Sequence, residues 1–117
     1  MSELESAYGL LREFKGRKIP EGRILSADEL HLLRILAADL LPDRKFDSVS
    51  FHEIIYAIAA EDTKWNFSLG ETLDNFYREI GAGKVDDGVG VLKTFLNSCP
   101  SRWYCSIAEI ELKNLDN

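Results

Sequence analysis

The sequence predicts an all-α protein, a compact bundle of about six helices whose neighbours are mostly antiparallel. Apolar residues recur at spacings of three and four, and the helix-start pattern Ser-x-x-Glu precedes three such stretches, at Ser26, Ser50 and Ser68. No segment sustains the two-residue alternation of a half-buried strand. The 117 residues, 45% of them hydrophobic and 29% charged, suit one globular domain, which we expect over residues 1–117.

Helix-breaking residues separate most of the expected helices. Glycine and proline in residues 16–22, Pro42, Gly81 with Gly83, and Pro100 mark the boundaries. The boundary at residues 61–67 is different, since we expect it to be a polar connection carrying two aromatic residues. The expected helices cover approximately residues 2–15, 26–41, 50–60, 68–80, 86–98 and 101–112.

The C-terminal segment leaves two interpretations open. Residues 103–107 are rich in aromatic residues and isoleucine, which suit a short strand. The start at Pro100-Ser101 and three turns of helical spacing favour a helix, and a short irregular C-terminal segment is the alternative for its end. We expect the helix.

The charge of the chain excludes one class of partner and favours another. The formal net charge is −6, and residues 26–117 carry nine basic and sixteen acidic side chains. Binding nucleic acid directly requires a basic face, so we do not expect it. An acidic protein attracts cationic partners, although net charge also serves simply to keep a small protein in solution.

Targeting and redox signals point to the cytoplasm. The N-terminus is acidic without an apolar core, and the longest apolar runs are too short to cross a bilayer, so we expect neither a secretory signal nor a membrane partner. Cys99 and Cys105 do not form a disulfide framework or a Cys-x-x-Cys motif. We expect both thiols to be reduced and partly buried.

No pattern of side chains supports catalysis or metal binding. His52-Glu53 begins like the zinc motif His-Glu-x-x-His, but Tyr56 takes the second histidine position, and His31 is 21 residues away. Asp86 and Asp87 would repel phosphate and are better explained as the acidic first turn of a helix. We therefore expect no enzyme, no cofactor, no metal and no small-molecule substrate.

A partner-binding surface is the remaining expectation. Trp65, with Glu61 and Asp62 before it, is a candidate aromatic anchor in an acidic loop. The alternative is that Trp65 and Phe67 fold back into the core. Residues 43–47, with mixed charge and an aromatic ring, are a second candidate loop.

The C-terminal part of the chain resembles a known family. Residues 76–80 (FYREI), 91–96 (VLKTFL) and 99–104 (CPSRWY) resemble small immunity proteins of bacterial contact-dependent growth inhibition systems. The resemblance covers residues 69–112, and its most particular element is the turn Cys-Pro-Ser-x-Trp-Tyr, in which Trp103 and Tyr104 are expected to be structural.

The resemblance implies a cytoplasmic protein that binds and neutralises a cognate toxin domain. Such toxins are often nucleases with basic active sites, which carboxylates could occupy in place of phosphates. The alternative is a non-catalytic helical adaptor or regulatory module that binds another protein through an apolar groove. The side chains expected to bind the partner are Asp43, Asp47, Glu61, Asp62, Asp86 and Asp87, with Trp65 as the anchor.

Overall fold

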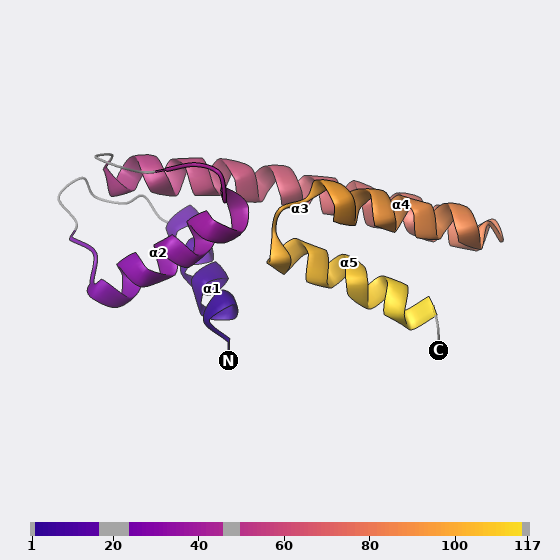
Figure 1. Cartoon of the computed structure of the whole chain (residues 1–117), viewed down its shortest axis with the longest axis horizontal. Helices are drawn as coiled ribbons and strands as arrows, with labels where there is room; N and C mark the ends of the chain where they lie inside the picture. Colours follow the sequence, from indigo (N-terminus) through magenta and orange to yellow (C-terminus); the bar gives the residue numbers. More distant parts are fainter. Residues whose placement is uncertain (1, 17–23, 46–49, 116–117) are drawn as a thin grey trace. The chain divides into compact units, whose positions relative to one another are not determined.

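The computed structural model describes residues 2–16, 24–45 and 50–115, and the regular structure of these residues is entirely helical. Figure 1 shows the elements in chain order: α1 (Glu3–Gly16), α2 (Ala27–Leu40), α3 (Phe51–Gly81), α4 (Val85–Ser98) and α5 (Arg102–Leu115). The all-α prediction is confirmed, and residues 103–107 are helical rather than a strand. None of the described helices combines the length and apolar character needed to cross a membrane.

A single long helix, α3, replaces the third and fourth helices of the prediction, so the expected count of six is wrong. Residues 61–67 continue the helix instead of forming a polar connection. They contain neither glycine nor proline, so nothing in their backbone interrupts helical hydrogen bonding. The buried positions of α3 keep helical spacing across the polar stretch. They are Ile55, Ile58, Asp62, Leu69 and Phe76.

Serine side chains begin four of the helices, and at the start of α1 Ser2 Oγ accepts from the Glu5 N–H at 3.1 Å. Ser26 and Glu29 form both halves of a capping box: Ser26 Oγ accepts from the Glu29 N–H at 3.1 Å, and the Glu29 carboxylate accepts from the Ser26 N–H at 3.0 Å. Ser50 Oγ accepts from the Glu53 N–H at 3.3 Å. Ser101 Oγ, fully buried, accepts from the N–H of Tyr104 at 3.1 Å.

The third Ser-x-x-Glu pattern, at Ser68, does not begin a helix. Ser68 lies inside α3, so the predicted cap there is wrong. A capping serine needs non-helical backbone and unsatisfied N–H groups after it. Inside a continuous helix those N–H groups already donate to carbonyls one turn earlier, and the pattern loses its meaning.

Packing divides the chain into two compact units: unit 1 is Met1–Asp62 and unit 2 is Thr63–Asn117. α3 contributes residues to both units. The largest fully buried apolar side chains of unit 1 come from all three of its helices. They are Leu11, Leu36, Leu40 and Ile58.

One polar pair lies inside the apolar core of unit 1. The Tyr8 hydroxyl on α1 donates to Asp39 Oδ2 on α2 at 2.7 Å, and the two residues are only 3% and 7% exposed. A hydrogen bond to a carboxylate is stronger than one between neutral groups, and it gives the buried Asp39 a partner. The pair therefore ties α1 to α2 at a fixed register.

The helices α1 and α2 run in the same general direction. The Glu3 carboxylate of α1 lies 3.1 Å from His31 Nε2 of α2. The second contact, between Tyr8 and Asp39, lies five residues later in α1 and eight residues later in α2. This pair departs from the expected antiparallel arrangement. Each of the two helices has 14 residues and is therefore about 21 Å long.

In unit 2, α3 and α4 form an antiparallel hairpin. The turn is a Schellman motif: the Lys84 N–H donates to the Glu79 carbonyl at 2.8 Å, and the Gly83 N–H donates to the Ile80 carbonyl at 3.0 Å. Gly83 has φ +79°, the left-handed conformation that this motif requires and that glycine adopts without strain. The expectation that a glycine ends this helix is confirmed.

Close packing of α4 on α3 depends on Gly88. A Cβ atom at this position would lie 2.9 Å from Ile80 Cδ1 and 3.4 Å from a ring carbon of Phe76. Towards the far end of the hairpin, the rings of Trp65 and Phe95 meet edge to face with centroids 6.1 Å apart. The two contacts hold the hairpin together near its turn and near its open end.

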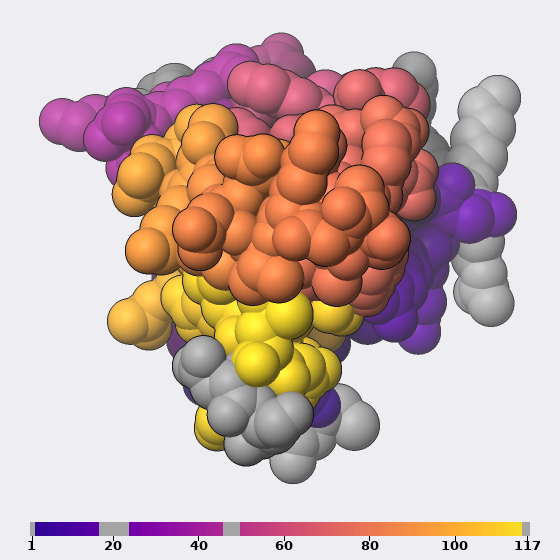
Figure 2. Space-filling model, turned by 90° about the vertical axis from the view of Figure 1, so that its right-hand side faces the viewer, coloured from indigo at the N-terminus to yellow at the C-terminus, as the bar shows by residue number. Residues whose placement is uncertain are grey.

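The last helix, α5, packs against α4. Figure 2 shows the orange surface of α4 directly against the yellow surface of α5. The Cys105 thiol in the first turns of α5 donates to the carbonyl of Cys99, the residue that ends α4, at 3.3 Å. Tyr104 and Ala108 are the buried residues of α5, so this helix completes the core of unit 2.

The buried pair in unit 1 predicts a specific loss of stability. Tyr8→Phe leaves Asp39 without its phenol donor, so we expect the free energy of unfolding to fall by about 1–3 kcal/mol. Urea denaturation followed by circular dichroism measures the change. Tyr56→Phe removes the same hydroxyl from an exposed side chain and should stay within about 0.5 kcal/mol of the natural sequence. Equal stabilities of the two variants would contradict the role of the pair.

Proline at position 66 tests the continuity of α3. Asn66→Pro removes a helical N–H and places the ring against the preceding turn, so we expect a loss of about 3 kcal/mol or more, measured by the same denaturation. Asn66→Ala is the control, and it should be as stable as the natural sequence or slightly more so because alanine has the higher helix propensity. A proline variant of unchanged stability would show that residues 61–67 are not helical.

Candidate functional site

The predicted acidic and aromatic site residues lie in different environments. Asp62 is buried, and its carboxylate forms a 2.8 Å ion pair with Lys15 Nζ of α1, inside unit 1. Its helical position places it on the buried side of α3 between Ile58 and Leu69. The Asp62 carboxylate is thus engaged within the unit, and we leave it out of the surface proposed below.

Trp65 is a packing residue of unit 2 in this structure. Its half-buried ring meets Phe95 of α4 edge to face, and Lys64 Nζ lies 4.8 Å from its ring centroid. Phe67, two residues further along the helix, instead points outward and is 68% exposed. The alternative of folding back into the core therefore describes Trp65 but not Phe67.

Asp86 and Asp87 are exposed in the first turn of α4. Carboxylates at this position interact favourably with the positive end of the helix dipole, which explains a helix start whose N-cap, Lys84, makes no side-chain cap. Within the described parts of the chain, neither aspartate forms an ion pair. Both carboxylates are therefore available to an external cation.

The remaining acidic candidates are less informative. Asp43 is exposed in the turn after α2, next to the basic residues Arg44 and Lys45. Glu61 is half-buried on α3 and has interactions within the protein. Asp47 lies outside the described residues. Asp86 and Asp87 thus form an exposed pair of carboxylates in the first turn of α4, whereas the other described acidic candidates lie elsewhere in the chain.

The two histidines occupy unrelated positions on α2 and α3. His31 Nε2 lies 3.1 Å from the Glu3 carboxylate at an exposed site. His52 stacks on Phe51 with ring centroids 4.2 Å apart, and its buried Nε2 atom forms no hydrogen bond with any described residue. Among the residues that the structure describes, no group of three metal-ligating side chains comes together.

A groove of about 310 Å³ between α3 and α4 was not predicted from the sequence. Its lining combines neutral polar side chains with two apolar ones. The polar residues are Ser68, Thr72, Asn75, Thr94 and Ser98, and the apolar residues are Val91 and Phe95. The hydroxyls of Thr94 and Ser98 donate to the carbonyls one turn earlier, Gly90 and Thr94, both at 2.9 Å. Ser68, Thr72 and Asn75 have the i, i+4, i+7 spacing of one helix face in the sequence. The prediction that Ser68 begins a helix did not place these three residues on one face of a continuous helix.

The carboxylate of Glu111 on α5 influences the pKa of Tyr77 on α3. The phenol of Tyr77 is hydrogen-bonded to the Glu111 carboxylate, which raises the pKa of Tyr77 above its ordinary value of 10.0. Partial burial and the negative charge of Glu111 raise the pKa further. Tyr77 and Ile110, on these neighbouring helices, are both more than half exposed.

No protein-family model, no curated protein and no solved structure matches the chain.

The raised pKa of Tyr77 predicts a pH-dependent contribution to stability. A group whose pKa is higher in the folded state contributes stability below its unfolded pKa, here about 10, and the contribution disappears as pH rises through the folded value. The stability difference between the natural sequence and Tyr77→Phe should thus be largest near neutral pH and shrink above about pH 10.

Absorbance titration of the phenols identifies the group. With Glu111→Gln, one phenol should titrate at a lower pH than in the natural sequence, because the carboxylate acceptor is gone. Titration curves that coincide would contradict the Tyr77–Glu111 bond, and Glu109→Gln, an exposed carboxylate on the same helix, is the matched control.

Proposed function

We propose that the protein is an immunity protein that binds and neutralises a cognate bacterial toxin domain, a basic nuclease, through exposed carboxylates. The proposal rests on the sequence resemblance over residues 69–112, on the net charge of −6, and on the side chains that the fold leaves available. Inhibition is stoichiometric and needs no catalytic group. We propose that the protein acts in the cytoplasm.

The observation that carries the proposal is the pair Asp86 and Asp87. Two adjacent carboxylates are exposed and unpaired within the described structure, at the start of α4. The Schellman turn with Gly83 and the close approach at Gly88 fix the backbone on both sides of them. Carboxylates held in this way can accept hydrogen bonds from lysine and arginine side chains that would otherwise bind phosphate.

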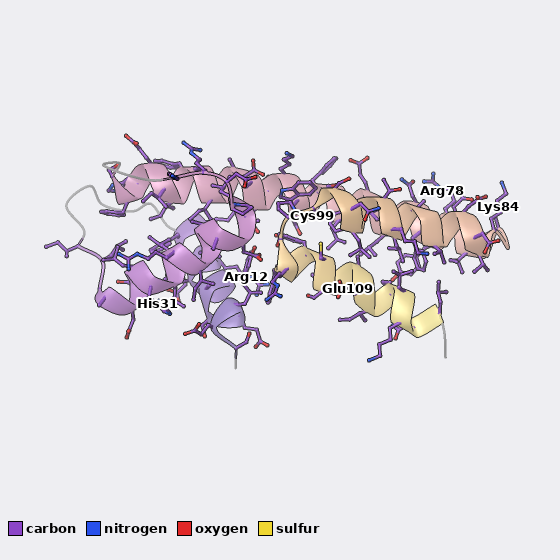
Figure 3. All side chains as sticks on the ribbon, viewed as in Figure 1. Arg12, His31, Arg78, Lys84, Cys99 and Glu109 are labelled. Carbon is purple, nitrogen blue, oxygen red and sulfur yellow. The ribbon has the colours of Figure 1, made fainter. Side chains whose placement is uncertain are left out.

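Two cations near the same turn modulate this charge. Figure 3 shows Arg78 and Lys84 close to the end of α3. Arg78 donates to the Asn75 side chain at 3.4 Å, whereas Lys84 forms no ion pair among the described residues. A basic partner should be attracted by the aspartates and repelled by Lys84. Neutralising the aspartates should therefore weaken binding, whereas neutralising Lys84 should accelerate it.

A second candidate function is favoured by the exposed Tyr77 and Ile110. Large apolar side chains exposed on neighbouring helices suit a helical adaptor that binds an amphipathic segment of another protein. Binding of that kind depends little on salt, whereas binding through Asp86 and Asp87 weakens as salt screens the charges.

Co-expression with the polypeptide encoded immediately upstream tests the proposed function. We expect rescue of growth and a one-to-one complex on co-purification. Asp86→Asn combined with Asp87→Asn should weaken that complex by about tenfold or more and reduce the dependence of its association rate on salt. Titration calorimetry and stopped-flow kinetics at several salt concentrations measure both effects.

Two further variants control for charge and folding. Glu71→Gln combined with Asp74→Asn removes two exposed carboxylates elsewhere in unit 2 and should change affinity much less. Lys84→Gln should accelerate association. If the affinity of the complex is unchanged in the Asp86/Asp87, Glu71/Asp74 and Lys84 variants and the complex persists at high salt, the adaptor function is favoured. If there is neither rescue of growth nor a complex, the immunity function is refuted.

A further inference from the structure

Cys99 and Cys105 lie at the two ends of the connection between α4 and α5. Figure 3 labels Cys99 at the point where the chain leaves α4 and turns into α5. Cys99 is 7% exposed and Cys105 is half-buried, and neither is in a disulfide. The Cys105 sulfur lies 3.3 Å from the carbonyl oxygen of Cys99.

This contact places the Cys105 sulfur against the backbone of Cys99. The carbonyl oxygen is two bonds from the Cys99 Cα, so the Cys105 sulfur is at most about 6 Å from that Cα. In a disulfide the two Cα atoms are about 4.4–6.8 Å apart and each sulfur lies between them, so closing the bond requires the Cys99 sulfur to turn towards the Cys105 sulfur. Cys99 also has extended backbone with ψ 125°, outside the helix, so its side chain is not held to the rotamers of a helical residue.

We propose that Cys99 and Cys105 form a reversible disulfide that locks the α4–α5 junction when a low-molecular-weight disulfide oxidises the protein. The Cys105 thiol loses its proton to solvent, and its thiolate attacks one sulfur of the oxidant. A mixed disulfide forms and one thiolate leaves. The Cys99 thiolate then attacks the Cys105 sulfur, the mixed bond breaks, and the second thiolate leaves, so that one disulfide is reduced while the two cysteines are oxidised.

The two cysteines have distinct roles in this exchange because their exposure differs. Cys105 is the more accessible thiol and meets the oxidant first. Cys99 needs to reach only its neighbour, so its burial does not prevent the second step. A bond that forms and breaks in this way fits a reducing compartment, in which protein disulfides are usually transient and act as redox sensors.

The locked junction would act on the packing of α5. Ser101, Tyr104 and Ala108 are buried just beyond Cys99. The present thiol–carbonyl hydrogen bond is weak, and a covalent bond in its place would hold the end of α4 to the start of α5. The oxidised protein should therefore melt at a higher temperature than the reduced one, and α5 should exchange its amide protons more slowly.

Oxidised glutathione, added to the folded full-length chain, tests the proposal. After the remaining thiols are capped with N-ethylmaleimide, intact mass spectrometry should show a product lighter by two hydrogen atoms, with no glutathione and no cap attached. Dithiothreitol should restore two reactive thiols. Cys99→Ser should instead accumulate one stable glutathione on Cys105, whereas Cys105→Ser should react far more slowly because its remaining thiol is buried.

Cys105→Ser also separates the disulfide from the hydrogen bond. The serine hydroxyl can still donate to the Cys99 carbonyl, so the fold is preserved, and circular dichroism checks this for both variants. If the natural chain accumulates glutathione as Cys99→Ser does, keeps two capped thiols, or links two chains through a disulfide, the proposed intramolecular bond does not form.

Discussion

The unbroken helical spacing of α3 is the constraint on which the fold depends, since both units take central buried residues from this helix. Ile55 and Ile58 serve unit 1, and Leu69 and Phe76 serve unit 2. Between them lies Asp62, a charged residue at a buried position, which is tolerated because Lys15 neutralises it at 2.8 Å. The ion pair thus lets the helix bury a carboxylate at the point where one unit ends and the next begins.

Local sequence signals were sufficient for most of the fold. The predicted starts at Ser26, Ser50 and Ser101 agree with the first residues of α2, α3 and α5, and Gly83 closes α3 as expected. The polar stretch 61–67 was misjudged because Asp62 looks like a break in the apolar pattern, and its partner Lys15 is 47 residues away in the sequence. A local pattern cannot reveal a compensating charge that only tertiary structure supplies.

The candidate site could be predicted only where exposure follows from the helix itself. Asp86 and Asp87 were expected in a first turn, and first-turn carboxylates are normally solvated. The prediction of a loop at residues 61–67 puts Asp62 on a surface and leaves Trp65 either on that surface or folded back into the core. In the continuous helix, the environment of each residue depends instead on which face it occupies. The groove between α3 and α4 required the pairing of two helices, which no single segment encodes.

The Schellman turn after α3 has a consequence for molecular recognition. Because Gly83 and its two backbone hydrogen bonds close the hairpin in one conformation, Asp86 and Asp87 follow a backbone that is already ordered before any partner arrives. Binding through these aspartates would then sacrifice little conformational entropy beyond that of two short side chains. Such a preorganised pair would suit the fast capture and slow release that the proposed inhibition requires.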